Sequence, residues 1–346
     1  MNKLQNFYKG KKVFISGGAG FIGSHLTDKL IKLGAITTVG DNLNNGTIRN
    51  VMRVWKNNDI SFSHSKKWVK TNSKHKFIKV DFQNYSDALK AIDGNEIVFH
   101  LSANFGGRGY ITNHPAACCE GFSINQNVIK ASQKNGVDRI LFASSACVYP
   151  PDLQDEYKSN YLLKEADAYK KNWAHADEPY GWAKLMGEKI LESHLKEYGI
   201  KGVSTRYVTV YGPWEDDTHA ITALIGRAVN REDPYIIWGS GNQDRDFTYV
   251  DDIVSGSLLA CKKVIDGSAI NLGTSKRYTI RETVELIFSI LNWHPKRIIF
   301  DKTKPEGVKT RALNIRKAKS LGWKPETDLI KGLEKTIRWF LKKSNP

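Results

Sequence analysis

A tyrosine and a lysine four positions apart, Tyr180 and Lys184, form the pattern in this sequence that points most directly to chemistry. In a helix this spacing places both side chains on one face. An ammonium beside a phenol is expected to lower the phenol's pKa from about 10, so that Tyr180 acts as a base near neutral pH. Ser145 follows a short apolar segment and is expected to hydrogen-bond the reacting oxygen at the carboxyl end of a strand. Taken alone, the Tyr–Lys pattern also fits an exposed helix turn.

A glycine-rich segment near the N-terminus predicts a dinucleotide site. Gly17, Gly20 and Gly23 have the spacing G-x-x-G-x-x-G between an expected strand and an expected helix. Glycine lets the backbone approach a pyrophosphate, and a helix N-terminus supplies free N–H groups and a positive dipole. Asp41 ends the next expected strand, where its carboxylate would bind ribose hydroxyls and repel a 2′-phosphate. The sequence therefore favours NAD over NADP.

The elements that must position these residues alternate between strands and helices. Alternation implies right-handed crossovers, and short apolar strands indicate a parallel sheet covered on both faces, which is an α/β fold. No internal repeat or low-complexity linker occurs, so two domains would be interwoven rather than tethered. Strands are expected at 12–16, 36–39, 77–80, 96–101, 139–143 and 202–208, and helices at 21–33, 48–55, 85–92, 124–135, 180–198, 251–263 and 330–342.

Length and composition bound the class of protein. A chain of 346 residues suggests about two domains, and 40% hydrophobic residues exclude disorder as a description of the whole. Four cysteines without metal-ligand spacing predict reduced thiols and no metal. No apolar stretch approaches the length of a membrane span and no secretory signal is evident, so we expect a cytoplasmic protein without a membrane partner.

The net charge of +16, from 52 Lys and Arg against 36 Asp and Glu, favours an anionic partner such as a phosphorylated small molecule. The alternative is a surface composition bias, since the lysines are scattered. No basic block is interleaved with aromatic residues, so nucleic acid is not expected.

Together the glycine segment, Asp41, Ser145 and the Tyr180–Lys184 pair resemble the extended short-chain dehydrogenase/reductase family, the NAD-dependent nucleotide-sugar epimerases and dehydratases. The resemblance covers nearly the whole chain. It implies a Rossmann domain with a doubly wound parallel sheet in residues 1–205, and a smaller, interwoven α/β domain in residues 206–346, with short return segments, that binds the nucleotide sugar. The cofactor-binding residues it implies are Gly17, Gly20, Phe21, Ile22, Gly23, Asp41, Asn42, Asp81, Phe82, Leu101, Ala103, Tyr180 and Lys184. Asp81 alone also fits a helix cap.

Cys147 separates the chain from the dehydratase branch, which has adjacent acidic residues after its serine or threonine. Residues 145–150 resemble the corresponding motif of GDP-mannose 3,5-epimerase and GDP-L-fucose synthase. In both enzymes that cysteine is an acid/base at the carbons flanking a 4-keto group, a role that suits a tunable thiol. The alternative is a small buried cysteine at a strand end.

A second acid/base is needed on the opposite face of the sugar ring. The segment around His219 resembles the one that carries this histidine in GDP-L-fucose synthase. A lone histidine is otherwise structural or solvated. The fucose synthase uses NADPH for a net reduction, whereas Asp41 here favours NAD, so the exact substrate stays open.

The loop at residues 105–111 resembles the glycine loop of those two enzymes. Arg245 and Arg311 resemble family residues that clamp the substrate diphosphate, which a planar guanidinium binds through paired hydrogen bonds. Surface ion pairs are the alternative. The substrate-binding residues implied are Gly106, Gly107, Arg108, Arg227, Arg245 and Arg311.

These expectations define an NAD-dependent nucleotide-sugar epimerase. Tyr180, with Lys184 and Ser145, would deprotonate the sugar 4-hydroxyl while hydride moves to NAD. Cys147 and His219 would then exchange protons at C3, C5 or both, and hydride would return to the ketone. A GDP-mannose-type substrate is favoured and a homodimer is implied. The alternative is a nucleotide-sugar 4-epimerase or 4-oxidoreductase in which Cys147 only shapes the pocket.

Overall fold

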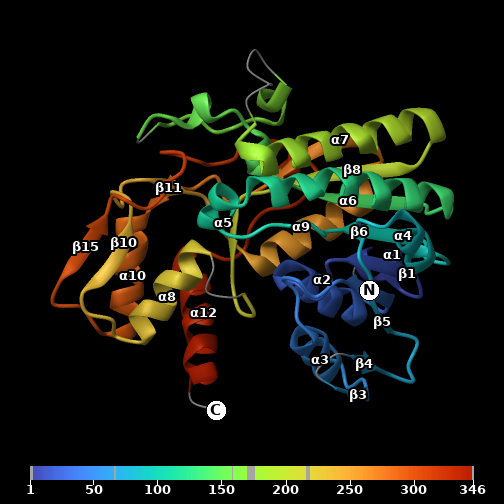
Figure 1. The fold of residues 1–346 in the computed structure, drawn as a ribbon, viewed down its shortest axis with the longest axis horizontal. Coiled ribbons are helices and arrows are strands. Elements are labelled where there is room, and N and C mark those ends of the chain that lie inside the picture. The colour runs from blue at the N-terminus through green and yellow to red at the C-terminus, as the bar shows by residue number, and fades with distance from the viewer. Residues whose placement is uncertain (1–2, 66–67, 158, 170–175, 216–218, 345–346) are drawn as a thin grey trace.

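The computed structural model describes residues 3–65, 68–157, 159–169, 176–215 and 219–344 (Figure 1). Its centre is a seven-stranded sheet in which all neighbouring strands run parallel. The strands follow the spatial order β13 (Asp266–Leu272), β8 (Lys201–Tyr207), β7 (Arg139–Ser145), β6 (Ile97–His100), β1 (Lys12–Ser16), β2 (Ile36–Asp41) and β5 (Lys76–Lys79). The expected doubly wound α/β sheet is confirmed.

Both faces of the sheet are buried because successive side chains of each strand point in opposite directions. In β1, Val13 and Ile15 join one apolar cluster and Phe14 joins another. The first cluster contains residues of α2 (Phe21–Lys32) and α9 (Val250–Lys263), and the second contains residues of α4 (Tyr85–Ile92), α6 (Pro115–Lys134) and α7 (Glu178–Tyr198). Helices therefore cover each face, which explains the continuous apolar strands.

The second half of the chain is divided between the sheet and a smaller unit. Strand β13 and helix α9 return to the sheet, so the two regions are interleaved. The smaller unit gathers at the left of Figure 1 around the parallel pair β10 (Tyr235–Trp238) and β15 (Ile298–Asp301). With it lie α8 (Ala220–Val229), α10 (Ile280–Leu291) and α12 (Leu329–Ser344). The domain division at residue 205 stays a prediction, and β8 continues to Tyr207.

Short elements complete the chain. The two-stranded pairs are β3 (Ser63–His64) with β4 (Val69–Lys70), β9 (Thr209–Tyr211) with β12 (Phe247–Tyr249), and β11 (Asp244–Arg245) with β14 (Tyr278–Thr279). The remaining helices are α1 (Lys3–Tyr8), α3 (Ile48–Asn57), α5 (Arg108–Asn113) and α11 (Arg316–Ser320), and the 3-10 turns are η1 (Ala146–Val148), η2 (Pro151–Gln154) and η3 (Glu165–Tyr169).

Helix α6 begins earlier than its sequence pattern predicts, at Pro115 rather than Ile124. Its first half carries small residues instead of a regular apolar stripe. A Cβ at Gly121 would lie 3.0 Å from the Ala183 Cβ of α7, so the two helices approach closely there. Tertiary packing, not apolar periodicity, thus forms this part of the helix.

The described residues contain neither a candidate membrane span nor a candidate metal cluster. None of their helices is both long enough and apolar enough to cross a membrane. Nor do they contain a group of three or more His, Cys, Asp or Glu side chains arranged to hold a metal ion.

Candidate active site

The predicted site residues gather where the parallel strands β1, β2, β6 and β7 end. Ser16 of β1 pairs with Gly40 of β2 and His100 of β6, so their carboxyl ends lie at one edge. Asp41 and Ser145 are the last residues of β2 and β7, and the segments that follow β1 and β6 carry the glycine turn and the 101–107 loop. In open α/β sheets this edge is where ligands bind.

The glycine turn between β1 and α2 is dictated by close packing. Gly17 has a φ of +71°, and a Cβ there would lie 2.9 Å from the Ser102 nitrogen. A Cβ at Gly23 would lie 2.2 Å from the Gly17 carbonyl oxygen. No side chain caps the start of α2 at Gly20, so the helix presents its first N–H groups and positive dipole to a ligand.

Asp41 ties the glycine turn to the end of β2. Its Oδ2 accepts a hydrogen bond from the Ala19 N–H at 3.0 Å, and its Oδ1 accepts from the Leu43 N–H at 2.8 Å. Burial raises the pKa of Asp41, while these two N–H donors oppose the rise. Each carboxylate oxygen keeps a second lone pair for a ribose hydroxyl. The uncapped helix and this carboxylate fit an adenine dinucleotide.

The other predicted cofactor-binding residues differ in their hydrogen bonds and in their burial. The Asn42 Oδ1 accepts from the Asn44 N–H, and the Asp81 Oδ1 accepts from the Gln83 N–H, each at 3.0 Å within its own turn. The ring of Phe82 lies in the core, 6.0 Å from that of Phe14, and therefore does not offer a stacking surface. Leu101 donates from its N–H to the Ser16 carbonyl, and Ala103 packs in the cluster that contains Tyr180.

Tyr180 and Lys184 stand on the first turns of α7, as their spacing predicts. Both side chains are buried, at 7% and 4% exposure. The ammonium of Lys184 lies 5.7 Å from the Tyr180 ring centroid and donates to the Ala143 carbonyl at 2.7 Å. Ser145 at the end of β7 lies beside the phenol, and its hydroxyl lowers the phenol's pKa. The strand β7 and the helix α7 thus bring the predicted Ser, Tyr and Lys together.

The expected lowering of the phenol's pKa is wrong for this arrangement. Burial raises the pKa of Tyr180 above its usual range, the nearby Cys147 adds to the rise, and the hydrogen bond with Ser145 only partly opposes it. Burial also lowers the pKa of Lys184 to about 8. Burial is the largest cause of both shifts, because removing water disfavours the charged form of each side chain.

Cys147 follows Ser145 in the turn η1 and is half-buried. Its N–H donates to the Ser145 Oγ at 3.1 Å, and its carbonyl accepts from the Asp177 N–H at 2.9 Å. A Cβ at Gly181 would lie 2.2 Å from that same carbonyl oxygen. The start of α7 is therefore packed on the Cys147 peptide, so Cys147 and Tyr180 keep a fixed relation.

His219 precedes α8 and joins the site through an aromatic ring. Its ring centroid lies 5.3 Å from that of Phe105, and Phe105 stacks on Tyr180 at 4.8 Å. The Nδ1 of His219 is 3.3 Å from the Oε1 of Glu215, a carboxylate that is 3% exposed. A buried carboxylate at this distance orients the imidazole.

Arg108, Arg245 and Arg311 converge beside the predicted glycine loop. A Cβ at Gly307, whose φ is +75°, would lie 3.4 Å from an Arg245 terminal nitrogen and 3.5 Å from the Arg108 Nε. Burial, with repulsion from Arg311 and Arg108, lowers the pKa of Arg245 to about 10. The buried carboxylate of Asp177 accepts from Arg108 at 2.9 Å and from Arg311 at 2.7 Å. This charge distribution suits a ligand with several negative oxygens.

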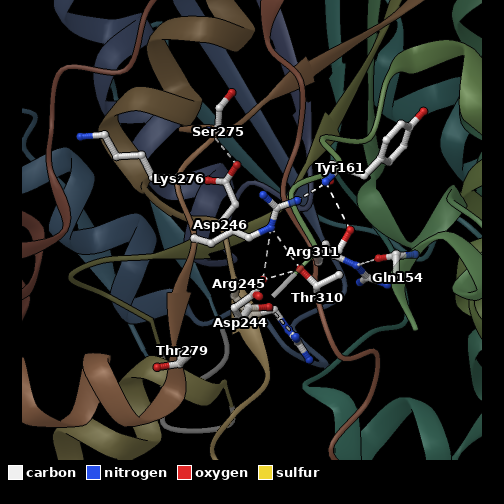
Figure 2. A network of polar contacts seen from close by, with 12 residues as sticks. Gln154, Tyr161, Asp244, Arg245, Asp246, Ser275, Lys276, Thr279, Thr310 and Arg311 are labelled. Carbon is white, nitrogen blue, oxygen red and sulfur yellow. Dashed lines mark hydrogen bonds and ion pairs between the residues drawn. The ribbon is translucent and has the colours of Figure 1, made fainter. Parts of the chain in front are cut away.

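Backbone pairing fixes the two segments that carry Arg245 and Arg311. The N–H of Asp244 donates to the Lys309 carbonyl at 3.0 Å, and the N–H of Asp246 donates to the Arg311 carbonyl at 2.9 Å. The Thr310 hydroxyl donates to the Asp244 carboxylate at 2.6 Å, as Figure 2 shows. The two arginines therefore emerge from neighbouring stretches of chain.

The remaining predicted substrate residues lie around this cluster, except one. Gly107 precedes α5, and a Cβ at Gly106 would lie 2.7 Å from the Tyr110 Cβ. Arg227, by contrast, is held on β10, because it donates to the Ile236 carbonyl at 2.6 Å.

Three residues of the site were not predicted from the sequence: Gln154, Asp177 and Glu215. Glu215 stands four positions before His219, a spacing that could have indicated a pair. Asp177 stands three positions before Tyr180, as an acidic residue at a helix start often does. Gln154 is the last residue of the 3-10 turn η2 and carried no sequence signal.

The fold and the site define a dinucleotide-binding enzyme with a Ser, Tyr and Lys set and a polyanion pocket. The profile of the "NAD dependent epimerase/dehydratase family" matches residues 13–273, and the chain belongs to this family. NAD is accordingly its cofactor, and the chain is an enzyme of the nucleotide-sugar epimerase and dehydratase type.

Named relatives show the breadth of that family. The chain is 32% identical over 337 residues to GDP-mannose 3,5-epimerase of Arabidopsis thaliana, covering 95% of this chain and 82% of the relative. It is 31% identical over 263 residues to GDP-L-fucose synthase of Escherichia coli K12, covering 70% and 79%. The crystal structure of UDP-glucuronic acid 4-epimerase from Bacillus cereus, in complex with UDP-glucuronic acid and NAD, matches with a TM-score of 0.78 and 28% identity, covering 96% and 99%. Relatives with different sugars and nucleotides match, so the family does not determine the substrate.

Proposed function

We propose that this protein is an NAD-dependent nucleotide-sugar epimerase that works through a transient 4-keto sugar, with proton exchange at C3, C5 or both. The observation that carries the proposal is Cys147. Its sulfur accepts a hydrogen bond from the Arg311 guanidinium at 3.3 Å, beside the Ser145–Tyr180 pair. A cation beside a sulfur favours the thiolate, the form of cysteine that accepts a proton.

In this mechanism, residues of the chain transfer protons at the sugar 4-hydroxyl and at the carbons that flank C4. Tyr180, as the phenolate that the positive charges of Lys184 and of a bound nicotinamide ring would stabilise, would take the proton of the sugar 4-hydroxyl, and Ser145 would hold the oxygen. Bound NAD, held by the glycine turn and Asp41, supplies a reversible hydride acceptor. The resulting ketone acidifies the neighbouring C–H bonds, so that Cys147 removes one proton and His219 supplies another. Each positioned acid or base contributes about a hundredfold to ten-thousandfold.

The substrate diphosphate would be bound by the arginine cluster. Arg245 is held by two carbonyls, those of Asp244 at 2.7 Å and Glu306 at 3.1 Å, and its further N–H groups stay available. Similarity to GDP-mannose 3,5-epimerase supports a GDP-linked sugar of the mannose type. We further propose a cytoplasmic homodimer formed through two paired helices, one of which is α7.

A second candidate is a nucleotide-sugar 4-epimerase or 4-oxidoreductase. Similarity to the UDP-glucuronic acid 4-epimerase favours it. That reaction needs Ser145, Tyr180 and Lys184, whereas Cys147 and His219 would only shape the pocket.

Solvent deuterium distinguishes the two reactions. The purified protein would be incubated in D2O with NAD and, separately, GDP-mannose, its 4-keto-6-deoxy derivative, GDP-manno-heptose and UDP-sugars, and the recovered sugars would be weighed by mass spectrometry. We expect the recovered sugar to gain one or two mass units, with no net accumulation of NADH. In Cys147→Ala the gain should vanish while NAD still binds, and Cys119→Ala, which changes an exposed cysteine on α6, should behave as the wild type. Inversion without deuterium uptake would favour the 4-epimerase.

A further inference from the structure

The guanidinium of Arg311 is held by protein groups on all three of its nitrogens. The Nε donates to the Gln154 Oε1 at 2.5 Å, one terminal nitrogen donates to the Cys147 Sγ at 3.3 Å, and the other donates to the Asp177 Oδ2 at 2.7 Å. The side chain is only 11% exposed. Because a guanidinium is planar and rigid, three partners in different directions fix both its plane and its position.

The partners of Arg311 are themselves fixed. Gln154 is fully buried and donates from its Nε2 to the Tyr149 and Pro150 carbonyls, at 3.2 and 3.1 Å, which leaves its oxygen for Arg311 (Figure 2). Burial would raise the pKa of Asp177, but Arg311 and Arg108 outweigh it and lower that pKa to about 2. Asp177 therefore stays charged at every pH at which the enzyme would work.

Arg245 provides an internal comparison. It lies in the same pocket on the neighbouring stretch of chain, yet its terminal nitrogens donate to the backbone carbonyls of Asp244 and Glu306 and not to the sulfur. Two arginines that the sequence assigned to the same task are thus held differently. Of these two arginines, Arg311 is the one that hydrogen-bonds the Cys147 sulfur, while Lys184 of α7 acts on Cys147 through its charge.

We propose that Arg311 is a positioning residue that orients the Cys147 sulfur and stabilises negative charge on it, and that Asp177 and Gln154 keep Arg311 in place. This deepens the proposed function, on which it rests, by naming what prepares the acid/base. A thiolate in a half-buried site needs a compensating charge, and Arg311 supplies it through a charge-assisted hydrogen bond.

The proton then has a defined route. As the C–H bond beside the sugar ketone breaks, an S–H bond forms on Cys147, the C–H electron pair forms a carbon–carbon double bond to C4, and the π pair of the ketone moves to its oxygen. No further reactant is needed. Reprotonation reverses these changes, from the other face of the carbon when the centre inverts.

The test is the pH dependence of Cys147 alkylation, which requires no sugar substrate. The full-length wild type and the variants Arg311→Gln, Arg311→Lys and Arg245→Gln would be treated with iodoacetamide between pH 5 and 10, and the Cys147 peptide would be quantified by mass spectrometry. Loss of a hydrogen bond to a charged group predicts alkylation at pH 7 about tenfold slower in Arg311→Gln, with the midpoint of the profile at higher pH. Arg311→Lys should recover part of the rate, and Arg245→Gln should keep the wild-type midpoint. The peptide that carries the exposed Cys119 serves as the control within each sample.

An unchanged profile in folded Arg311→Gln would overturn the proposal. If that variant does not fold, Arg311→Lys decides, because an ammonium cannot hold all three partners and must still move the midpoint measurably. A shifted profile combined with deuterium exchange that persists in Cys147→Ala would refute the proposed function and leave the role of Arg311 intact.

Discussion

Replacing Glu188 by Gln should destabilise the fold far more than an ordinary substitution on a helix. Glu188 stands one turn after Lys184 on α7 and is 1% exposed, and its partner Arg206 is fully buried. The two carboxylate oxygens accept from Arg206 at 2.9 and 2.7 Å. They also accept from the hydroxyls of Ser144 at 2.5 Å and Tyr169 at 2.6 Å. Arg206 is the chief cause that lowers the pKa of Glu188 against the effect of burial.

Breaking a buried ion pair by changing one partner leaves the other charge without compensation, which costs about 3–5 kcal/mol. We therefore expect the free energy of unfolding of Glu188→Gln to fall by about that amount, measured by urea denaturation with a circular dichroism readout. Glu192→Gln is the matched control, because Glu192 lies one turn further along α7 and pairs with Lys189 in solvent. An exposed pair of this kind is worth less than about 1 kcal/mol.

A double-mutant cycle isolates the pair. In the variant that combines Glu188→Gln with Arg206→Met, the free energy of unfolding should fall by less than the sum of its decreases in the two single variants. The reason is that the double variant leaves no buried charge uncompensated. If Glu188→Gln were as stable as Glu192→Gln, the buried ion pair would not be holding α7 against β7 and β8, and the reasoning would be wrong.

Three further predictions address the cofactor site, the histidine and acid stability. Gly23→Ala should weaken NAD binding by more than tenfold in a fluorescence titration, because the new Cβ would lie 2.2 Å from the Gly17 carbonyl oxygen. Gly20→Ala should weaken binding less, because its Cβ would lie 3.2 Å from the same oxygen. Equal effects of the two variants would count against the packing argument. Glu215→Gln should lower kcat about tenfold with little change in KM, since the carboxylate orients His219 without facing the sugar; a change confined to KM would contradict this. Burial, aided by Lys184, lowers the pKa of His100 to about 3. As pH falls, His100 is therefore protonated at a higher pH in the unfolded chain than in the folded protein. The free energy of unfolding consequently decreases as pH falls from about 6.5 towards 3. The free energy of unfolding of His100→Asn should therefore depend less steeply on pH in that interval, and an unchanged slope would show that other groups carry the acid sensitivity.

Local sequence patterns were sufficient for the Rossmann half. Apolar strands alternating with amphipathic helices predicted the parallel sheet, because such strands are stable only when both faces are covered. The glycine turn and Asp41 were recognisable because steric limits on φ and on Cβ contacts act over a few residues. The helix that carries Tyr180 and Lys184 was expected at residues 180–198, and α7 spans Glu178–Tyr198.

Tertiary structure decided what these local patterns do not encode. Cys147 and Arg311 are 164 positions apart, and they meet only because the chain leaves the sheet, forms the smaller unit and returns beside β11. Asp177 and Gln154 acquire their roles from that meeting. The raised pKa of Tyr180 depends on how much water the folded chain removes, which no spacing predicts. Sequence by itself therefore determined the fold class, the cofactor and the reactive residue types. Burial and long-range contacts determined the charge state and the partners of each, because desolvation and pairing exist only once the chain is folded.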